Sequence, residues 1–407
     1  MKKLFLAVLL VTLFTTTQAQ TVSPNDAVTL PSAPITNAIV SVYGLIDVGY
    51  IGTNYTGTNA GIKTKQTQSF IGQSAQSASR LGFKGTEDLG GGTKAFFTIE
   101  TTLNPVNGTL IPGTNRQTFI GISQSGYGKI AFGTQFTGIF KAVSATDAGN
   151  LNDMVGDVIN ATSVQAFGNP GAAPFSDPTG NAGSSGAYTV RTANTVSIDT
   201  ERFNGFSGNG FYALNNQTNT QTNATTGGTA NYNGFGLGAN YVWNKLYVTA
   251  NYQALKSLLT ASTLTTPQPT LWTAAAGGIN TQDNQKYLAA TYDFTVVKGY
   301  LQWINRKAVD TLNTNYFSNR TAQQIGVRGY ITPAVEGWAQ AGNGKVTAFG
   351  SSQPTANFVG YQTGANYWLS KRTNLYVIYG QTKTSGVSAS ASAVSASNYA
   401  AGLRTVF

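Results

Sequence analysis

The last segment of the sequence, residues 398–407, constrains the fold most strongly. Tyr399, Leu403 and Phe407 share one face of this segment and alternate with mostly small or polar residues, as in a β-strand. In water, a strand with one apolar face and a bare edge invites aggregation. A closed barrel removes the edge, because the last strand pairs with the first, and the apolar face then meets lipid. The segment therefore predicts an all-β fold, a transmembrane antiparallel β-barrel.

The start of the sequence predicts export. Residues 1–19 contain two early lysines, an apolar run and a small-residue cleavage site that ends at Ala19, as in a secretory signal peptide. The apolar run is too short to span about 30 Å as a helix. Residues 20–38 contain three prolines and are expected to form an irregular N-terminal segment. The barrel is then expected to occupy residues 39–407.

The composition is typical of strands that alternate between lipid and water. Of the 407 residues, 41% are hydrophobic but only 10% are charged, compared with about 25% charged residues in typical soluble domains. No later stretch has the apolar length of a transmembrane helix, so a membrane protein of this sequence must span the bilayer as a barrel. A soluble all-β protein is the alternative, and the low charge argues against it.

The residue types exclude several chemistries. The sequence has no Cys and no His, which removes thiolates, disulfides and the commonest general base and metal ligand. A Ser- or Cys-based hydrolase relay therefore lacks its usual base, and we expect no enzyme activity, no metal and no cofactor. The formal charge is +10, or +8 without Lys2 and Lys3, but the basic residues are scattered singly. Nucleic acid is therefore not an expected partner.

Runs with a two-residue period recur along the sequence after residue 38. In residues 245–254, for example, apolar side chains at even positions alternate with mostly polar ones at odd positions. About sixteen strands follow, an even number as single-chain barrels require. The expected strands are 39–51, 78–87, 92–103, 114–123, 127–136, 188–200, 206–215, 232–242, 245–256, 285–294, 297–308, 322–331, 335–346, 357–368, 373–383 and 398–407.

The expected connections alternate between short and long. Tight turns on one side and long loops on the other are the layout of an outer-membrane barrel, whereas a soluble sandwich does not sort its connections in this way. Turns are expected at 87–91, 124–126, 243–244 and 332–334, and long polar loops at 52–77, 257–284 and 384–397.

Several of these segments resemble one protein family. Residues 79–90, SRLGFKGTEDLG, are similar to the second strand and first turn of the general Gram-negative porins, with the β-proteobacterial porins as the nearest match. Residues 42–47, 115–122 and 126–135 resemble the first, fourth and fifth strands of that family, and residues 400–407 resemble its terminal strand. The resemblance extends over the sequence after residue 38.

The resemblance implies a sixteen-stranded barrel, a homotrimer in outer-membrane lipid and a water-filled pore for small hydrophilic solutes and ions. It also implies that a long third external loop, residues 137–187 here, folds into the pore as a constriction. The barrel-assembly machinery reads the family's terminal strand, so Tyr399, Leu403 and Phe407 are the expected signal. The sequence departs from the family at Thr134 and Ser197, where Arg is common, which weakens the expected row of basic groups.

Charged residues on both sides of the predicted pore are the candidate functional residues. Leu81 and Phe83 share one face of their strand, so Arg80 and Lys84 share the other. Because a basic side chain at mid-depth on the lipid face costs roughly 2–4 kcal/mol, the lumen is its expected location. Residues 152–157 resemble the acidic tip of the family's constriction loop. The expected basic side is Arg80, Lys84, Arg116 and Arg191, and the expected acidic loop residues are Asp147, Asp153 and Asp157.

Such an arrangement would place a transverse field across the pore, which orients dipolar solutes. The alternative is that these charges are merely solvated in a wide lumen. Further basic residues on polar strand faces, Lys298, Arg306, Arg328 and Arg404, favour anions if they line the pore. The expected function is passive diffusion; a substrate-specific porin and a non-conducting structural or adhesive barrel remain alternatives.

Overall fold

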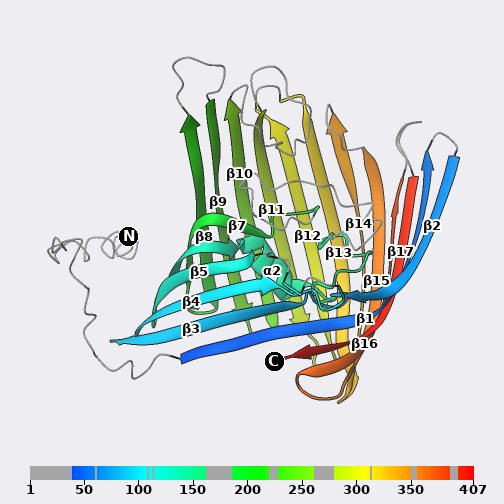
Figure 1. Cartoon of the computed structure of the whole chain (residues 1–407), viewed down its shortest axis with the longest axis horizontal. Coiled ribbons are helices and arrows are strands. Elements are labelled where there is room, and N and C mark those ends of the chain that lie inside the picture. Colours follow the sequence, from blue (N-terminus) through cyan, green and yellow to red (C-terminus); the bar gives the residue numbers. More distant parts are fainter. Residues whose placement is uncertain are drawn as a thin grey trace. The chain divides into compact units, whose positions relative to one another are not determined.

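The computed structural model describes residues 39–59, 62–107, 110–111, 113, 115–161, 186–219, 228–260, 279–311, 314–349, 355–385 and 393–407. The predicted leader and the segment 20–38 lie outside these residues. The strands form one antiparallel sheet (Figure 1). They are β1 (Ile39–Asn59), β2 (Ile62–Gln73), β3 (Arg80–Gly90), β4 (Thr93–Thr102), β5 (Asn115–Gln124), β6 (Gly128–Phe136), β7 (Arg191–Thr200), β8 (Phe206–Asn219), β9 (Gly228–Trp243), β10 (Leu246–Thr260), β11 (Ile279–Asp293), β12 (Val297–Asp310), β13 (Phe317–Thr332), β14 (Val335–Phe349), β15 (Ala356–Trp368), β16 (Thr373–Thr384) and β17 (Ala393–Val406).

The sheet closes between its first and last strands, as the terminal segment predicts. β1 pairs with β17 in a continuous antiparallel register from Leu45 opposite Val406 to Thr58 opposite Ala393. Two backbone hydrogen bonds extend the pairing to the final residue, from Gly44 N–H to the Phe407 carbonyl (3.0 Å) and from Phe407 N–H to the Gly44 carbonyl (3.1 Å). Closure satisfies the backbone of both edges, which lipid cannot do.

The barrel has sixteen strand positions because the two short strands β2 and β3 lie one after the other in the single position beside β1. β3 pairs with the first part of β1 and β2 with the second part, on the edge of β1 opposite β17. Residues 74–79 separate β2 from β3 and turn inward: the N–H groups of Gln76 and Ser77 donate to Oδ2 of Asp47 at 2.8 and 2.7 Å. The prediction of a sixteen-stranded barrel is confirmed.

The predicted loop at 52–77 is wrong. β1 continues to Asn59 and β2 begins at Ile62, so most of this polar segment is a hairpin. Its Thr, Asn and Gly residues gave no apolar alternation, but pairing of β1 with β17 and β2 satisfies the backbone regardless of side chain. β10, β11 and β17 also extend into segments expected to be loop, for the same reason.

The predicted tight turns lie at one end of the barrel. At the turn between β3 and β4, Gly90, Gly91 and Gly92 have φ angles of 85°, 60° and 80°, a conformation that other residues adopt only with strain. The connection between β6 and β7 contains the one helix among the described residues, α2 (Gly138–Thr146). No helix in the described part of the chain is long and apolar enough to cross a membrane.

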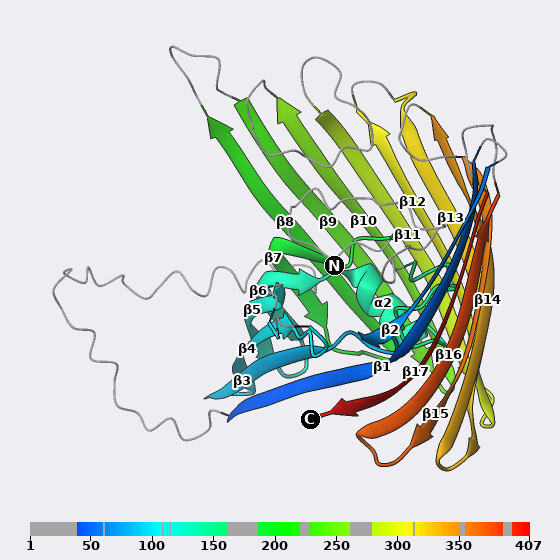
Figure 2. The same ribbon diagram turned by 45° about the vertical axis from the view of Figure 1, so that its right-hand side comes forward.

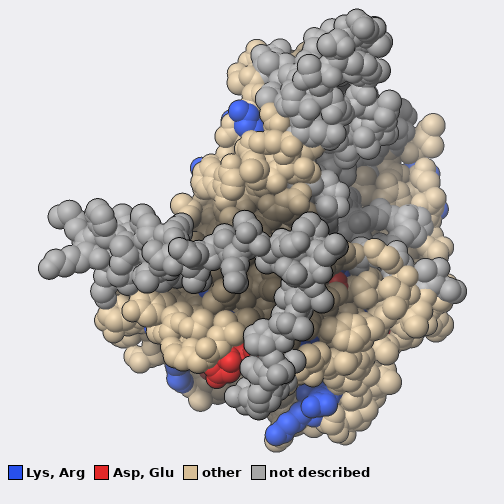
Figure 3. Space-filling model, turned by 60° about the vertical axis from the view of Figure 1, so that its left-hand side comes forward, with Lys and Arg blue, Asp and Glu red and all other residues tan. Residues whose placement is uncertain are grey.

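The outer face of the barrel is apolar. Outward side chains include Ile120, Leu301, Ile325 and Val377, each more than half exposed, and the face in Figure 3 has only separate patches of charge. The inner face holds the buried polar groups, such as Asp47, Gln302 and Gln362. α2 contacts strands β8 to β12 on this inner side (Figure 2).

Candidate functional site

A cluster of basic side chains gathers around one carboxylate on the inner face of the short strands. Nε of Arg116 lies 2.7 Å from Oε1 of Glu100, and Nε of Arg80 lies 3.9 Å from its Oε2. The hydroxyl of Tyr43 donates to the same Oε2 at 3.1 Å. Two guanidinium groups therefore share one carboxylate, which leaves a surplus of positive charge on this wall.

A β-bulge turns Arg116 inward. Strict alternation along β5 would put Arg116 on the same face as Ile120, which is 63% exposed on the lipid side. However, Glu100 pairs with Gln117 and Thr101 pairs with Asn115, so Arg116 is an extra residue with no partner in the register. The extra residue reverses the alternation and brings the guanidinium to Glu100.

The other two predicted basic residues also lie on the inner face. Lys84 lies on β3, the strand that also carries Arg80, and its Nζ is 5.4 Å from the centre of the Tyr43 ring. Arg191, the first residue of β7, donates from Nη1 to the Asn115 carbonyl at 3.2 Å, and its guanidinium carbon lies 5.8 Å from the centre of the Phe136 ring. All four predicted basic side chains thus lie on β3, β5 and β7.

The connection between β6 and β7 begins with a capped helix. Thr137 precedes α2, and its Oγ1 accepts a hydrogen bond from Phe140 N–H at 3.2 Å, which satisfies one free donor of the first turn. The same hydroxyl donates to the Thr189 carbonyl at 2.7 Å. The two ends of the connection are therefore fastened together at the point where it leaves the wall.

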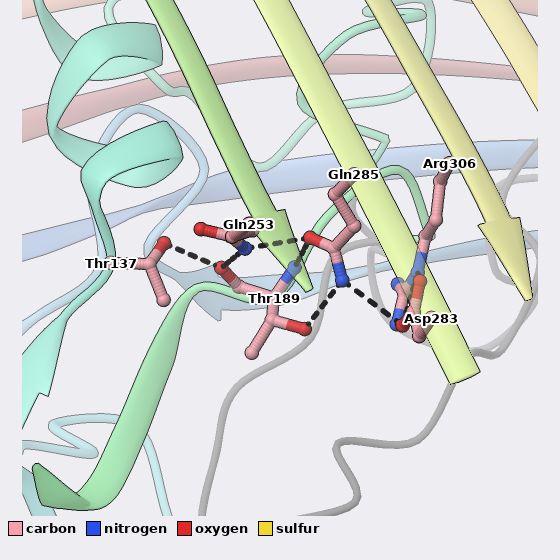
Figure 4. Close-up of polar contacts among 6 residues, drawn as sticks. All are labelled: Thr137, Thr189, Gln253, Asp283, Gln285 and Arg306. Carbon is pink, nitrogen blue, oxygen red and sulfur yellow. Dashed lines mark hydrogen bonds and ion pairs between the residues drawn. The ribbon is translucent and has the colours of Figure 1, made fainter. Parts of the chain in front are cut away.

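A buried polar chain fastens this point to the opposite strands (Figure 4). Thr189 N–H donates to Oε1 of Gln285 at 2.8 Å, and Nε2 of Gln253 donates to the same oxygen at 2.7 Å. Nε2 of Gln285 then donates to Asp283 at 3.0 Å, and Asp283 forms an ion pair with Arg306 at 2.6 Å. Arg306 is fully buried, so this cation belongs to the anchor and adds no net charge to the pore.

Glutamines on the inner face hold the segment that follows α2. Gly149 N–H donates to Oε1 of Gln340 at 3.0 Å, and Val158 N–H donates to Oε1 of Gln324 at 2.9 Å. Nε2 of Gln362 donates to the Met154 carbonyl at 2.6 Å. These glutamines lie on β13, β14 and β15, so residues 147–158 lie against that wall. These glutamines are not among the residues predicted from the sequence, although the strand period places them on the polar face.

Glycines allow the segment to lie close to the strands. A Cβ at Gly380 on β16 would overlap the carbonyl oxygen of Val155, and a Cβ at Gly360 on β15 would overlap that of Gly156. Gly156 itself has a φ angle of 106°, which a side chain would strain. At Gly360 and Gly380 the backbone of the loop therefore packs directly against the backbone of the strands. These two glycines are here called the glycine track.

An apolar cluster inside the barrel supports the same segment. Ile139 and Val143 of α2 are fully buried together with Ile159, and they pack with Ile304 of β12 and Phe358 of β15. Burial of such side chains stabilises by roughly 1.5–3 kcal/mol each. The polar inner face predicted from the strand period is therefore interrupted where the loop packs.

The three acidic residues of the loop have different environments. Asp157 is fully buried, and its Oδ1 accepts hydrogen bonds from the N–H groups of Ile159 and Asn160, both at 2.7 Å. Oδ2 of Asp147 accepts from Leu151 N–H at 2.6 Å. Burial, together with the Asp157 charge, raises the pKa of Asp147 well above its ordinary value, and burial also raises the pKa of Asp157.

Asp153 is the one of the three that is partly exposed. Its N–H donates to the Ala75 carbonyl at 3.1 Å, so the inward residues between β2 and β3 hold it in place. Burial raises the pKa of Asp153 to about 7, while the charges of Arg116 and Arg80 act in the opposite direction. Of the three predicted acidic residues, Asp153 is the one whose carboxyl pKa is lowered by the charges of Arg116 and Arg80.

The closed antiparallel barrel, its apolar outer face and its charged interior define a transmembrane channel-type barrel. The sequence matches the family model described as Gram-negative porin over residues 9–387. The chain therefore belongs to the Gram-negative porin family, and it is a barrel of the bacterial outer membrane, as the sequence analysis predicts.

Individual relatives agree with the family match. An outer membrane porin protein of Bordetella pertussis is 28% identical over 273 residues, which are 64% of this chain and 62% of the relative. The solved structure of an anion-selective porin from Comamonas acidovorans has a TM-score of 0.66 at 21% identity, covering 91% of this chain and all of that one. A trimer form of OmpT from Vibrio cholerae has a TM-score of 0.56 at 12% identity, covering 91% of this chain and all of that one. The chain spans about three fifths of the length of the curated relatives it matches.

Proposed function

We propose that the protein is a water-filled channel for passive diffusion of small hydrophilic solutes and ions. The observation that carries the proposal is the position of Asp153, on a loop fastened to the inner wall, toward Arg80 and Arg116 on the short strands. Opposed charges across a narrow passage orient dipolar solutes and slow apolar ones. In this proposal the described residues 137–161 of the predicted loop 137–187 form the constriction, while residues 162–185 lie outside the described residues. The family and fold are those of a channel rather than of an enzyme.

The channel prefers anions. Arg80 and Arg116 share Glu100, and Arg191 adds a further charge on the same wall. By contrast, Arg306 and Arg328 on the opposite wall pair with Asp283 and Glu336 at 2.6 Å each. Local charge near the passage, and not the net charge of the chain, decides ion choice. The anion-selective Comamonas porin of similar fold supports this preference.

The functional unit is a homotrimer, assembled after removal of residues 1–19. The trimeric Vibrio structure of similar fold supports this assembly. Tyr399, Leu403 and Phe407 are each about two-fifths exposed on the outer face of the last strand. There they are accessible to the machinery that recognises the terminal strand during insertion.

The test is single-channel recording of the purified, unboiled protein in a planar bilayer, with the reversal potential measured across a KCl gradient. We expect large ohmic steps in groups of three and a potential of the sign that chloride preference gives. No conductance from a correctly folded barrel would overturn the channel and favour a structural or adhesive role. Saturable block by one sugar or anion would replace passive diffusion with a substrate-specific channel.

A further inference from the structure

Four phenylalanines on the inner side of the barrel form two ring pairs close to the predicted basic side. The rings of Phe96 on β4 and Phe119 on β5 meet edge to face, with their centres 6.3 Å apart. The rings of Phe136, at the end of β6, and Phe140 on α2 are stacked, with their centres 4.2 Å apart. β4, β5 and β6 are consecutive in the sheet (Figure 2). The four residues are here called the aromatic strip.

The strand register places the first ring pair on the inner face. Phe96 lies four residues before Glu100 on β4, and the pairing of β3 with β4 has no bulge between them. Phe119 is directly paired with Thr98, which lies two residues before Glu100. Residues two or four apart on a strand share a face, and so do residues directly paired across strands. Both rings therefore face inward, as Glu100 does.

The second ring pair also lies inside the barrel. Phe136 and Phe140 both pack against the apolar cluster that α2 forms with the strands. All four rings of the aromatic strip nevertheless remain partly exposed. The aromatic strip therefore offers a passing solute apolar surface that is otherwise in contact with water, and covering that surface is favourable.

Basic side chains flank both ring pairs. Lys84 is directly paired with Thr98, and Thr98 with Phe119, so one inward row of the sheet holds both the lysine and the ring. The guanidinium carbon of Arg191 lies 5.8 Å from the centre of the Phe136 ring. Among the described residues, neither Lys84 nor Arg191 forms an ion pair with a carboxylate. Each ring pair thus lies beside a positive charge that an anion can meet.

Packing accounts for one ring in part. A Cβ at Gly121 of β5 would lie only 2.5 Å from Cζ of Phe96, so the ring covers this glycine. Aromatic cover of glycines is a known way to strengthen a sheet. Cover needs an apolar side chain but not the face of a ring. Leucine can therefore replace phenylalanine in a packing role but not in ring stacking, which separates the two roles by experiment.

We propose that the aromatic strip makes the channel favour aromatic carboxylates over other organic anions of the same charge and size. The ring of such a solute stacks against the phenylalanines, while its carboxylate meets Lys84 or Arg191. Contact between aromatic rings adds to the gain from buried apolar area, and a cation beside a ring adds a further attraction. The inference rests on the proposed diffusion channel and names a class of solute for it.

The expected preference is modest, so passage remains diffusive. One ring contact at a partly exposed site corresponds to about a threefold gain in local concentration. A gain of this size enriches the solute along the wall without holding it there. The current carried by an aromatic carboxylate should therefore rise with concentration and not saturate.

The test uses the intact protein in a planar bilayer, with benzoate and cyclohexanecarboxylate as probes. The two anions have the same charge and similar size, and simple apolar contact would favour the second. The reversal potential against chloride gives the permeability of each probe. We expect benzoate to be about threefold more permeant, after correction for mobility in water. Equal permeabilities in a channel that conducts chloride would overturn the aromatic preference alone, whereas a barrel that does not conduct would overturn the channel as well.

Matched variants separate ring stacking from charge and from packing. Phe119→Leu/Phe140→Leu removes one ring from each pair but keeps apolar side chains, and its benzoate preference should disappear. Phe83→Leu/Phe132→Leu removes two rings from the outer face, where they are 42% and 53% exposed, and should keep the preference. Lys84→Gln should lower the permeability of both probes and leave their ratio unchanged. A preference that survives in the first variant, or disappears equally in the second, would contradict a site at the aromatic strip.

Discussion

The guanidinium of Arg116 and the carboxylate of Glu100 lie 2.7 Å apart on neighbouring strands, and the bulge between β4 and β5 makes this contact possible. Without the extra residue, Arg116 would project into lipid with Ile120. The bulge thus moves a cation from the lipid face of the wall, where it would be costly, to the inner face, where Glu100 pairs with it.

Removing the Arg116 charge should shift the ion preference toward cations. In Arg116→Gln, Glu100 retains only the more distant of its two cations, Arg80 at 3.9 Å, beside the hydroxyl of Tyr43. A unit charge about 4 Å from an ion in water is worth about 1 kcal/mol, or roughly a fivefold change in local ion concentration. The measurement is the reversal potential across a KCl gradient. Arg202→Gln, at an exposed turn, is the control, and an equal shift there would refute a local role for Arg116.

Neutralising Glu100 should have the opposite effect. Glu100→Gln leaves Arg80 and Arg116 without their shared carboxylate, so the chloride preference should rise by a similar factor. The combined variant Arg116→Gln/Glu100→Gln should lie between the two single variants. If both single variants moved the reversal potential in the same direction, the change would reflect distortion of the wall instead of charge.

Much of this architecture can be predicted from the sequence, because strand alternation and the terminal segment both report directly on lipid contact. The inward position of Arg80 follows from Leu81 and Phe83 alone. Arg116 is different: strand alternation predicts the lipid face, and a bulge leaves no mark in the residue types. Its inward position could be predicted only from the family resemblance.

The sequence could not predict how residues 147–158 of the loop are held. Glycines such as Gly360 and Gly380 resemble ordinary barrel glycines, and only the contact with Val155 and Gly156 gives them a role. The hairpin of β1 and β2 was missed because its stability comes from pairing, which polar side chains do not reveal. Long-range contacts decide both features, and neither leaves a local pattern.

The glycine track predicts that a single methyl group displaces the loop. In Gly380→Ala, the new Cβ would overlap the Val155 carbonyl oxygen, so the loop or the strand must move. Overpacking of this kind costs roughly 1–3 kcal/mol, which should lower the temperature at which the barrel unfolds in detergent and alter its conductance. In Gly208→Ala, the nearest atom would be 3.7 Å from the new Cβ, so that variant should behave normally. Equal behaviour of the two variants would contradict the track.

The position of Asp153 makes ion preference depend on pH. Burial raises the pKa of its carboxyl to about 7, with Asp47 adding to the effect and Arg116 and Arg80 opposing it. Below this pH the carboxyl is neutral, and above it the carboxylate offsets the basic side. Because the folded-state pKa is raised, the contribution of Asp153 to stability is greatest in acid and is lost as pH rises through about 7.

We therefore expect chloride preference to be strongest near pH 5 and to fall as pH rises through about 7, measured as reversal potential in the same KCl gradient at each pH. Asp153→Asn keeps the shape of the side chain but cannot ionise, so it should hold the acid value throughout. Asp293→Asn, at an exposed turn, should retain the full pH dependence. A titration that survives in Asp153→Asn would assign the effect to the buried pair Asp147 and Asp157, whose carboxyl pKa values are also raised.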